Sequence, residues 1–345
     1  MKTACRLAVC ALVVLAWSIA LAEVTVKNYS WLQLPPSAVT ASCGNPAGTG
    51  GSDHGHPDMF RWGERVWIPN GTLTADGTGD YWATLTFDKP RSVKLVKTQF
   101  WADESTQLQA FLIEGTTDGK TWTKIGSYDS GEMKTGDPLT PPDVTVTDGD
   151  YLAIRVRMSK GGYMYDRPER GGPGLYTIEP YGDGTLTDSE VNWANKENFA
   201  TVASVSGMNQ DSNTRFNDGA LWEAARTGCK PGAWPADAYA QIDLGKSRTI
   251  GKVIVAWHMG YAQGIEATLF KVKYSTDGVT FNDVTGLSAP VRLAGPSAMQ
   301  YTFDPVAAQY VRITDMVGTN YTLFTQVLVY GPDKQGGIPP AAAGP

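Results

Sequence analysis

Two short stretches of the sequence carry side chains that could bind a metal ion or a ligand. In the first, residues 53–58, His54 and His56 lie between two aspartates, and nearby glycines and a proline indicate a loop. Neutral imidazoles and carboxylates are suitable ligands for zinc and other first-row metals. Three interpretations stay open: a metal site, a polar loop that contacts a ligand, and a solvated loop. Arg61 and Trp62 follow closely and would belong to a sugar site here.

The second stretch ends an apolar segment with Trp257 and His258 and reaches Tyr261 within a glycine-containing loop. Carbohydrate recognition needs a flat apolar face for the C–H side of the ring and polar groups for its hydroxyls. An aromatic side chain beside an imidazole offers both. Further loop residues of the same region complete the candidate set: Trp222, Arg226 and Trp234. Each aromatic residue alone could equally pack in a core or a loop, so the hypothesis concerns the set.

The sequence contains no recognisable catalytic motif. It has no Gly-x-Ser-x-Gly elbow, no phosphate-binding loop and no His-Glu-x-x-His zinc motif. A glycosidase would need two carboxylates facing each other across a cleft, and nothing in the sequence positions such a pair. We therefore predict that the protein is not an enzyme. The enzymatic alternative is a metal-dependent hydrolase built on residues 53–58.

The segments that must position these residues occur twice. Residues 116–122 (TTDGKTW) return as residues 275–281 (STDGVTF), and four other landmarks keep their order at offsets of 149 to 159 residues. A repeat of this length indicates two copies of a whole domain. The four further pairs are residues 82–87 with 239–244, Trp101 with Trp257, residues 153–156 with 310–313, and residues 181–182 with 330–331.

Both copies have the pattern of β-strands. Apolar and polar side chains alternate with period two in residues 82–87, 152–158 and 270–274, and turn residues separate such runs. The pairs Asp118-Gly119 and Asp277-Gly278 stand between strand-like runs and predict hairpin turns, since both residue types tolerate a positive φ. The fold class that follows is all-β, with one antiparallel β-sandwich in each copy.

The N-terminus is typical of a secretory signal peptide. A basic start precedes an apolar run over residues 7–21, and Ala20-Leu21-Ala22 provides the small residues expected before cleavage at Glu23. The run is too short for a usual membrane span, although a retained N-terminal anchor is the alternative. We expect residues 1–22 to be removed and the mature protein to be secreted, either to the cell exterior or to a periplasm.

Cleavage would leave an acidic chain with few cysteines. Removal of two basic residues leaves 27 of the 29 against 35 acidic residues, a net charge of −8. This charge argues against nucleic acid and against anionic membrane lipid as partners, because both require a basic surface. Cys43 and Cys229 remain, one in each copy, either as separate thiols or as a bridge between the copies.

The predicted domain organisation follows from the repeat and from composition. A signal peptide over residues 1–22 precedes the first sandwich, and a linker separates it from the second. The C-terminal residues are rich in proline, glycine and alanine, a composition typical of disorder. The boundaries are residues 23–182 for the first sandwich, 183–191 for the linker, 192–332 for the second sandwich and 333–345 for the tail.

The second copy resembles a known family. Residues 239–245 (YAQIDLG) are similar to the "YVQIDLG" strand of discoidin domains, also called coagulation factor 5/8 type C domains. Trp257 and residues 274–278, 310–313 and 327–331 follow in the order that the family shows. The resemblance covers about residues 192–332. The first copy is similar to a divergent relative, with its matches at residues 117–122 and 181–182.

The resemblance implies a jelly-roll, galactose-binding-like β-sandwich whose loops at one end hold the ligand. Similar domains of bacterial secreted proteins are carbohydrate-binding modules, and animal relatives bind glycans, collagen or phosphatidylserine membranes. The resemblance also implies a structural calcium ion with ligands at Asp218 and Gln326, or Thr177 in the first copy. The family has a glutamate at the position of Gln326. Calcium prefers oxygen ligands with carboxylate charge, so its replacement weakens the expected site.

Together these observations predict a secreted, non-catalytic protein of two tandem discoidin-like sandwiches that binds carbohydrate. A galactose-type or uronic residue of a polysaccharide fits the resemblance. Each site would bind weakly because one sugar ring buries little surface, and two linked sites would gain avidity. The alternative is a structural or adhesive protein of the cell surface or matrix whose sandwiches contact other proteins.

Overall fold

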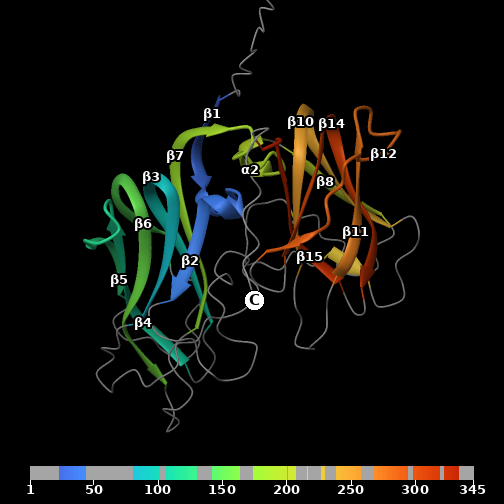
Figure 1. Cartoon of the computed structure of the whole chain (residues 1–345). Helices are drawn as coiled ribbons and strands as arrows, with labels where there is room; N and C mark the ends of the chain where they lie inside the picture. The colour runs from blue at the N-terminus through green and yellow to red at the C-terminus, as the bar shows by residue number, and fades with distance from the viewer. Residues whose placement is uncertain are drawn as a thin grey trace, which may run out of the picture.

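The computed structural model consists almost entirely of β-strands arranged in two sheets (Figure 1). None of the helices in the ranges that it describes is long and apolar enough to cross a membrane. The described residues are 23–43, 81–101, 106–129, 142–163, 174–199, 201–206, 216, 227–229, 238–257, 267–293, 298–318 and 322–333.

The first sheet has seven strands in the order β1-β7-β3-β6-β4-β5, with β2 paired to β3. Two short 3₁₀ helices, η1 and η2, connect β1 to β2. The bounds are β1 (Glu23–Ser30), η1 (Trp31–Gln33), η2 (Pro36–Ala38), β2 (Val39–Cys43), β3 (Tyr81–Trp101), β4 (Thr106–Thr116), β5 (Thr123–Asp129), β6 (Val144–Tyr163) and β7 (Gly174–Thr187).

The second sheet has eight strands in the order β12-β11-β14-β10-β15-β9, with β13 paired to β14 and β8 to β10. A short helix, α2, precedes it. The bounds are α2 (Lys196–Phe199), β8 (Val202–Ser206), β9 (Thr227–Cys229), β10 (Tyr239–Trp257), β11 (Ala267–Ser275), β12 (Asn282–Asp283), β13 (Val291–Arg292), β14 (Ala298–Gly318) and β15 (Thr322–Tyr330).

Each sheet forms two layers because its two longest strands change partners halfway. β3 and β6 pair with each other along most of their length, with a register shift between Thr86 and Arg91. Before the shift β3 also pairs with β2, and after it with β7. β10 and β14 repeat the arrangement, with a shift between Asp243 and Arg248 and with β8 and β15 as the successive partners of β10. The two halves of the chain therefore share the arrangement of these central strands, whereas β1, β9 and β13 differ between them.

The predicted alternation decides which side chains fill the sandwich. Ala83, Leu85 and Phe87 are buried, whereas Thr86 on the opposite face of the strand is exposed. Period-two alternation sends successive side chains to opposite faces, so one face of the strand packs in the core. The all-β fold class predicted from the sequence is confirmed.

The sheet register corrects one detail of the repeat. In the ladder of β3 with β7 the register shifts between Gln99 and Phe100, and in the ladder of β10 with β15 it shifts between Ala256 and Trp257. Phe100 therefore occupies the position of Trp257, and the match of Trp101 to Trp257 by residue type is wrong by one residue. The irregularity at this point hides the true correspondence from a comparison of letters.

The two predicted hairpin turns are confirmed, and each is fixed by its own aspartate. The Oδ1 atom of Asp277 accepts hydrogen bonds from the backbone N–H groups of Val279 and Thr280, both at 2.8 Å. These N–H groups stabilise the ionised form and lower the pKa of Asp277 to about 2. Gly278 has a φ of +75°, which explains the need for glycine. Asp118 makes the equivalent bonds in the first turn.

Trp122 and Phe281, beside these turns, pack on the sheets. Each ring stacks on an arginine of the outer sheet face: Trp122 lies 4.3 Å from the Arg155 guanidinium, and Phe281 lies 3.5 Å from that of Arg312. A second aromatic residue lies near each arginine, Trp82 in the first sandwich and its equivalent in the second. Cation–π contacts of this kind attach the turn to the sheet.

The segment expected to link the sandwiches is largely regular structure. Residues 183–187 continue β7 and pair with β1, with Thr187 opposite Glu23. Backbone pairing holds this segment in place, which a free linker would not be. At the other boundary, the carboxylate of Asp333, the first residue of the predicted tail, contacts the Lys252 ammonium at 2.5 Å. Residues 334–345 lie outside the described part.

The close packing of β7 on β3 gives a first prediction. A Cβ atom at Gly182 would lie 1.7 Å from the Ser92 carbonyl oxygen, which already accepts a hydrogen bond from the Trp31 indole at 2.6 Å. We expect Gly182→Ala to lower the free energy of unfolding by about 3 kcal/mol, because neither backbone can move away alone. Urea unfolding measures the change, and Thr185→Ala at an exposed position of the same strand serves as control. Equal stabilities of the two variants would contradict the packing.

Candidate functional site

Three strands meet at the end of the second sandwich where the predicted sugar-binding residues are attached. Phe324 of β15 pairs with Trp257 of β10 on one side and with Thr227 of β9 on the other. Neighbouring strands are about 4.8 Å apart, which places the backbones of Trp257 and Thr227 about 10 Å from each other. Thr227 and Trp257, which are far apart in the sequence, therefore lie at the same end of the second sandwich.

Two predicted residues are sequence neighbours of these paired positions. Arg226 immediately precedes Thr227, and His258 immediately follows Trp257. Of the predicted carbohydrate-binding set the structure describes the backbone of Trp257. The remaining members lie outside the described residues and stay predictions: His54, His56, Arg61, Trp62, Trp222, Arg226, Trp234, His258 and Tyr261.

Gln326, the predicted calcium ligand on β15, is fully buried and pairs with Ala256 of β10. The N–H group of the next residue, Val327, donates to the Phe216 carbonyl at 2.8 Å, so the chain at residue 216 runs beside β15. Asp218 lies outside the described residues. Among the residues that are described, no group of three or more His, Cys, Asp and Glu side chains could hold a metal ion.

The side chain of Gln326 fits calcium in part. Its amide oxygen is a ligand type that calcium accepts, but it brings no negative charge. The equivalent position of the first sandwich holds Thr177, which pairs with Gln99 and is also buried. A hydroxyl is likewise a neutral ligand. The described part of both sandwiches therefore supplies neutral oxygens where the family has a carboxylate.

A buried carboxyl group that the sequence interpretation missed lies two residues further along β7. Glu179 pairs with Lys97 of β3, is 6% exposed, and its Oε1 accepts a hydrogen bond of 2.9 Å from the Ser30 hydroxyl. Burial raises the pKa of Glu179 to about 7, against the hydrogen bonds of Ser30 and Tyr181 and the charge of Lys97. The available signal was a glutamate within a largely apolar strand, at a position that alternation places beside Tyr181.

Glu190, in the turn after β7, has a lowered pKa, in contrast to Glu179. Glu190 lies near Arg91 and Lys89, at distances of 2.8 and 3.1 Å. Burial opposes its ionisation, but the Thr187 N–H group and the two cationic side chains outweigh burial and lower the pKa of Glu190 to about 2. At neutral pH Glu190 is thus ionised, whereas Glu179 is close to half protonated.

Comparison with known proteins finds one family match, which lies in the second half of the chain. Residues 189–326 match the family model described as the F5/8 type C domain. No curated protein matches the chain.

Similar solved structures include the CBM32-1 and CBM32-2 domains of Clostridium perfringens ZmpB in complex with GalNAc, at 9% identity and a TM-score of 0.32, covering 88% of this chain and 91% of that chain. A fucolectin from striped bass (Morone saxatilis) serum has 14% identity and a TM-score of 0.29, covering 89% and 98%. Allantoicase has 14% identity and a TM-score of 0.32, covering 77% and 81%. At these TM-scores the fold assignment rests on the strands of the protein itself.

Glu179 and Glu190 should change the free energy of unfolding in opposite directions as the pH rises. The folded protein keeps the Glu179 proton up to about pH 7, whereas the unfolded chain loses it near pH 4.5. Between these two pH values only the unfolded chain gains from ionisation of Glu179, so the free energy of unfolding falls as the pH rises. By pH 8 the loss is about 3 kcal/mol, and Glu179→Gln should recover it while changing little at pH 4.5. Urea unfolding at several pH values measures this.

The matched control is Glu190→Gln. The pKa of Glu190 is lowered, so its stabilising effect is present above the unfolded value and is lost as the pH falls toward 2. This variant should lose stability at pH 8, where Glu179→Gln gains it. A Glu179→Gln profile that runs parallel to the wild type would show that Glu179 ionises normally.

Proposed function

We propose that the protein is a non-catalytic carbohydrate-binding protein, because residues 189–326 match the F5/8 type C family model. The family match carries this proposal, and the meeting of β9, β10 and β15 at one edge supports the location of the site. In the sequence, Arg226 immediately precedes β9 and His258 immediately follows β10. A galactose-type or uronic residue is the proposed ligand, in keeping with the sequence resemblance.

Recognition would combine stacking with hydrogen bonding. Trp257 would stack on the C–H face of a sugar ring and supply apolar contact. His258 and Arg226 would supply donors for the hydroxyls. One ring buries little surface, so affinity per site is weak and no large interface is needed. We also propose that the signal peptide directs the protein out of the cytoplasm. The glycans that it would bind occur outside the cytoplasm.

The alternative function is adhesion through protein contacts. The exposed large apolar side chains in the described part are Val202, Val279, Leu287 and Val291, and they come from separate elements. Specific protein interfaces usually have a buried apolar centre, so these scattered residues favour the sugar-binding function. Competition by free monosaccharide distinguishes the two functions, because a protein-contact surface would not respond to it.

The proposed site is tested by the double variant Trp257→Ala with His258→Ala. Loss of the stacking surface and of one donor should weaken binding on a glycan array at least about tenfold, equivalent to about 1.4 kcal/mol. Circular dichroism and thermal unfolding confirm that the variant is folded. His54→Ala with His56→Ala tests the candidate residues of the first sandwich, and binding lost in this variant but kept in the first would place the site in the first sandwich.

We further propose that calcium binds weakly near Gln326, with Asp218 as the family's other ligand. Gln326→Glu restores the carboxylate of the family. In chelator this variant should be less stable than the wild type by about 3 kcal/mol or more, because the new charge is buried without a partner. Millimolar calcium should reverse the loss, as measured by thermal unfolding.

Gln33→Glu provides the control for calcium. Gln33 is also fully buried, but it lies on η1 of the first sandwich. This variant should be destabilised equally with calcium and with chelator. If Gln326→Glu behaves in the same way, calcium does not bind at this position.

A further inference from the structure

The segment after β7 is bonded to both sandwiches through one buried side chain, Asn192. It is 1% exposed, and its Nδ2 atom donates to the Gln33 Oε1 atom at 2.6 Å. The Asn192 backbone N–H group donates to the Tyr29 hydroxyl at 3.0 Å, and Oδ1 accepts from the backbone N–H of Val329 at 2.9 Å. Tyr29 and Gln33 belong to the first sandwich, and Val329 belongs to β15 of the second.

A second buried contact joins the same elements. The Tyr330 hydroxyl donates to the Gln33 carbonyl oxygen at 2.8 Å, and both residues are 0% exposed. A buried polar group that loses its partner without gaining water is costly. Separation of the sandwiches would have to expose Tyr330, Gln33 and Asn192 to water together. A partial opening would break their hydrogen bonds without replacing them by bonds to water, so it is unfavourable.

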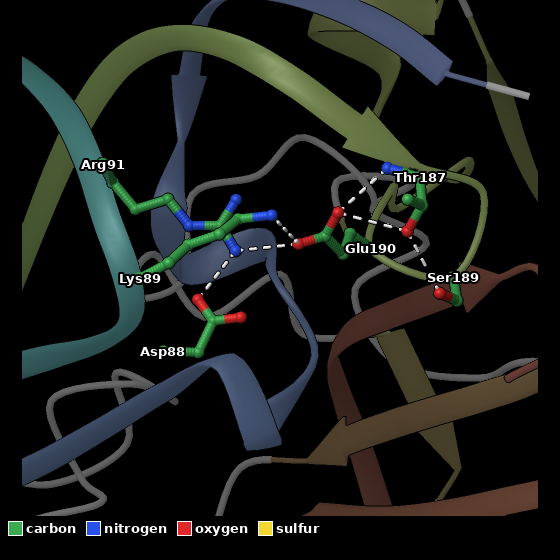
Figure 2. Close-up of polar contacts among 6 residues, drawn as sticks. All are labelled: Asp88, Lys89, Arg91, Thr187, Ser189 and Glu190. Atoms are coloured by element: carbon green, nitrogen blue, oxygen red, sulfur yellow. Dashed lines mark hydrogen bonds and ion pairs between the residues drawn. The ribbon is translucent and has the colours of Figure 1, made fainter. Parts of the chain in front are cut away.

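A cluster of charged side chains also holds the turn that follows β7 (Figure 2). Arg91 of β3 is 4% exposed, and its Nη2 atom lies 2.8 Å from both Glu190 Oε1 and Asp88 Oδ1. Glu190 is held from the other side, since its Oε2 accepts from the Thr187 N–H at 2.9 Å. The turn that carries Glu190 is in turn attached to the second sandwich, because the Gly331 N–H donates to the Asp188 carbonyl.

The apolar cores of the two sandwiches are also continuous. One cluster of buried side chains runs from Tyr29 and Leu32 of the first sandwich through Val191 and Trp193 to Val329 of the second. Independent domains each have a separate core, and motion between them is expected unless their interface is extensive and apolar. This junction is apolar, buried and hydrogen-bonded.

We infer that the two sandwiches form one rigid body that unfolds as a single unit. One long strand of each sandwich passes the junction: β3 passes it at Arg91 and continues for ten residues to Trp101, and β10 passes it at Gly251, beside Pro332, and continues for six residues to Trp257, in the proposed site. At about 3.3 Å per residue both strands end roughly 20 to 33 Å from the junction. Figure 1 shows α2 near the upper ends of both β7 and β10.

A rigid junction has a consequence for the ligand, and this step rests on the proposed function. Two sites held at a constant separation gain most from a ligand that carries the same residue at repeated positions, because the second contact needs no further ordering of the protein. The favoured ligand is therefore a repeating polysaccharide or a dense glycan surface rather than one short oligosaccharide.

The rigid body is tested first, without any ligand. Lys120 and Val279 are exposed and occupy equivalent positions of the two hairpin turns. Spin labels on Lys120→Cys and Val279→Cys, in a chain with Cys43→Ser and Cys229→Ser, report the distance between the sandwiches. One narrow distance distribution is expected. A broad or multiple distribution overturns the inference, whatever the protein binds.

Loosened variants then test the consequence for binding. Asn192→Ala removes the buried centre, and Asn198→Ala is the matched control, because the Asn198 amide also reaches the first sandwich, at the Lys27 carbonyl, but from an exposed position. The wild type and Asn198→Ala should bind a densely galactose-coated surface at least tenfold more tightly than a sparse one. Asn192→Ala should give a broader distance distribution and lose most of this gain.

The outcomes separate the two proposals. An Asn192→Ala chain with a broadened distance distribution and an unchanged gain on the dense surface would overturn the paired-site step. Absence of galactose binding by the wild type at both densities would contradict the proposed galactose specificity, and the distance distribution would still decide the rigid body. If Asn192→Ala does not fold, the wild-type distance distribution and a single, two-state calorimetric transition remain as tests.

Discussion

Continuous backbone pairing along two bent ribbons is the constraint on which the rest of this structure depends. β3 with β6, and β10 with β14, each cross from one layer of a sandwich to the other with pairing on both sides of the bend. Buried N–H and C=O groups require partners, so the ribbon can bend only where a register shift accommodates it. The bend determines which strands form each layer. It also directs the far ends of β3 and β10 away from the junction.

The junction shows how a tandem repeat can become one unit. A polar linker would let two sandwiches of this size move independently, as domains joined by exposed segments commonly do. Here β7 remains in the sheet to Thr187, and the chain after it contributes Asn192 to a buried centre. Buried polar groups add geometric specificity that apolar packing alone does not, because hydrogen bonds require defined directions.

The two sandwiches share the arrangement of their central strands but differ in the chemistry of equivalent positions. Glu179 of the first occupies the position of Leu328 in the second, two residues before the shared Tyr-Gly ending. The first sandwich thus buries a carboxyl group where the second buries an aliphatic side chain. This difference gives the first sandwich a group that titrates near neutral pH. It also agrees with the greater divergence of the first copy in sequence.

The sequence by itself determined the features that depend on neighbouring residues. Alternation along residues 82–87 determined a strand and its buried face, and Asp277 with Gly278 determined a turn, because the bonds of that turn lie within four residues. The candidate site was predicted by residue type and family resemblance, and the structure adds the pairing of Trp257 with β15, whose other side pairs with β9.

Only the tertiary structure decided which distant residues share an environment. The correspondence of Phe100 with Trp257 depends on a register shift, the pKa of Glu179 on burial, and the role of Asn192 on partners from two sandwiches. Alternation could place Glu179 beside Tyr181, but neither its burial nor the pairing of the other residues can be read locally, because burial and cross-strand pairing arise from residues that the chain brings together only when it folds.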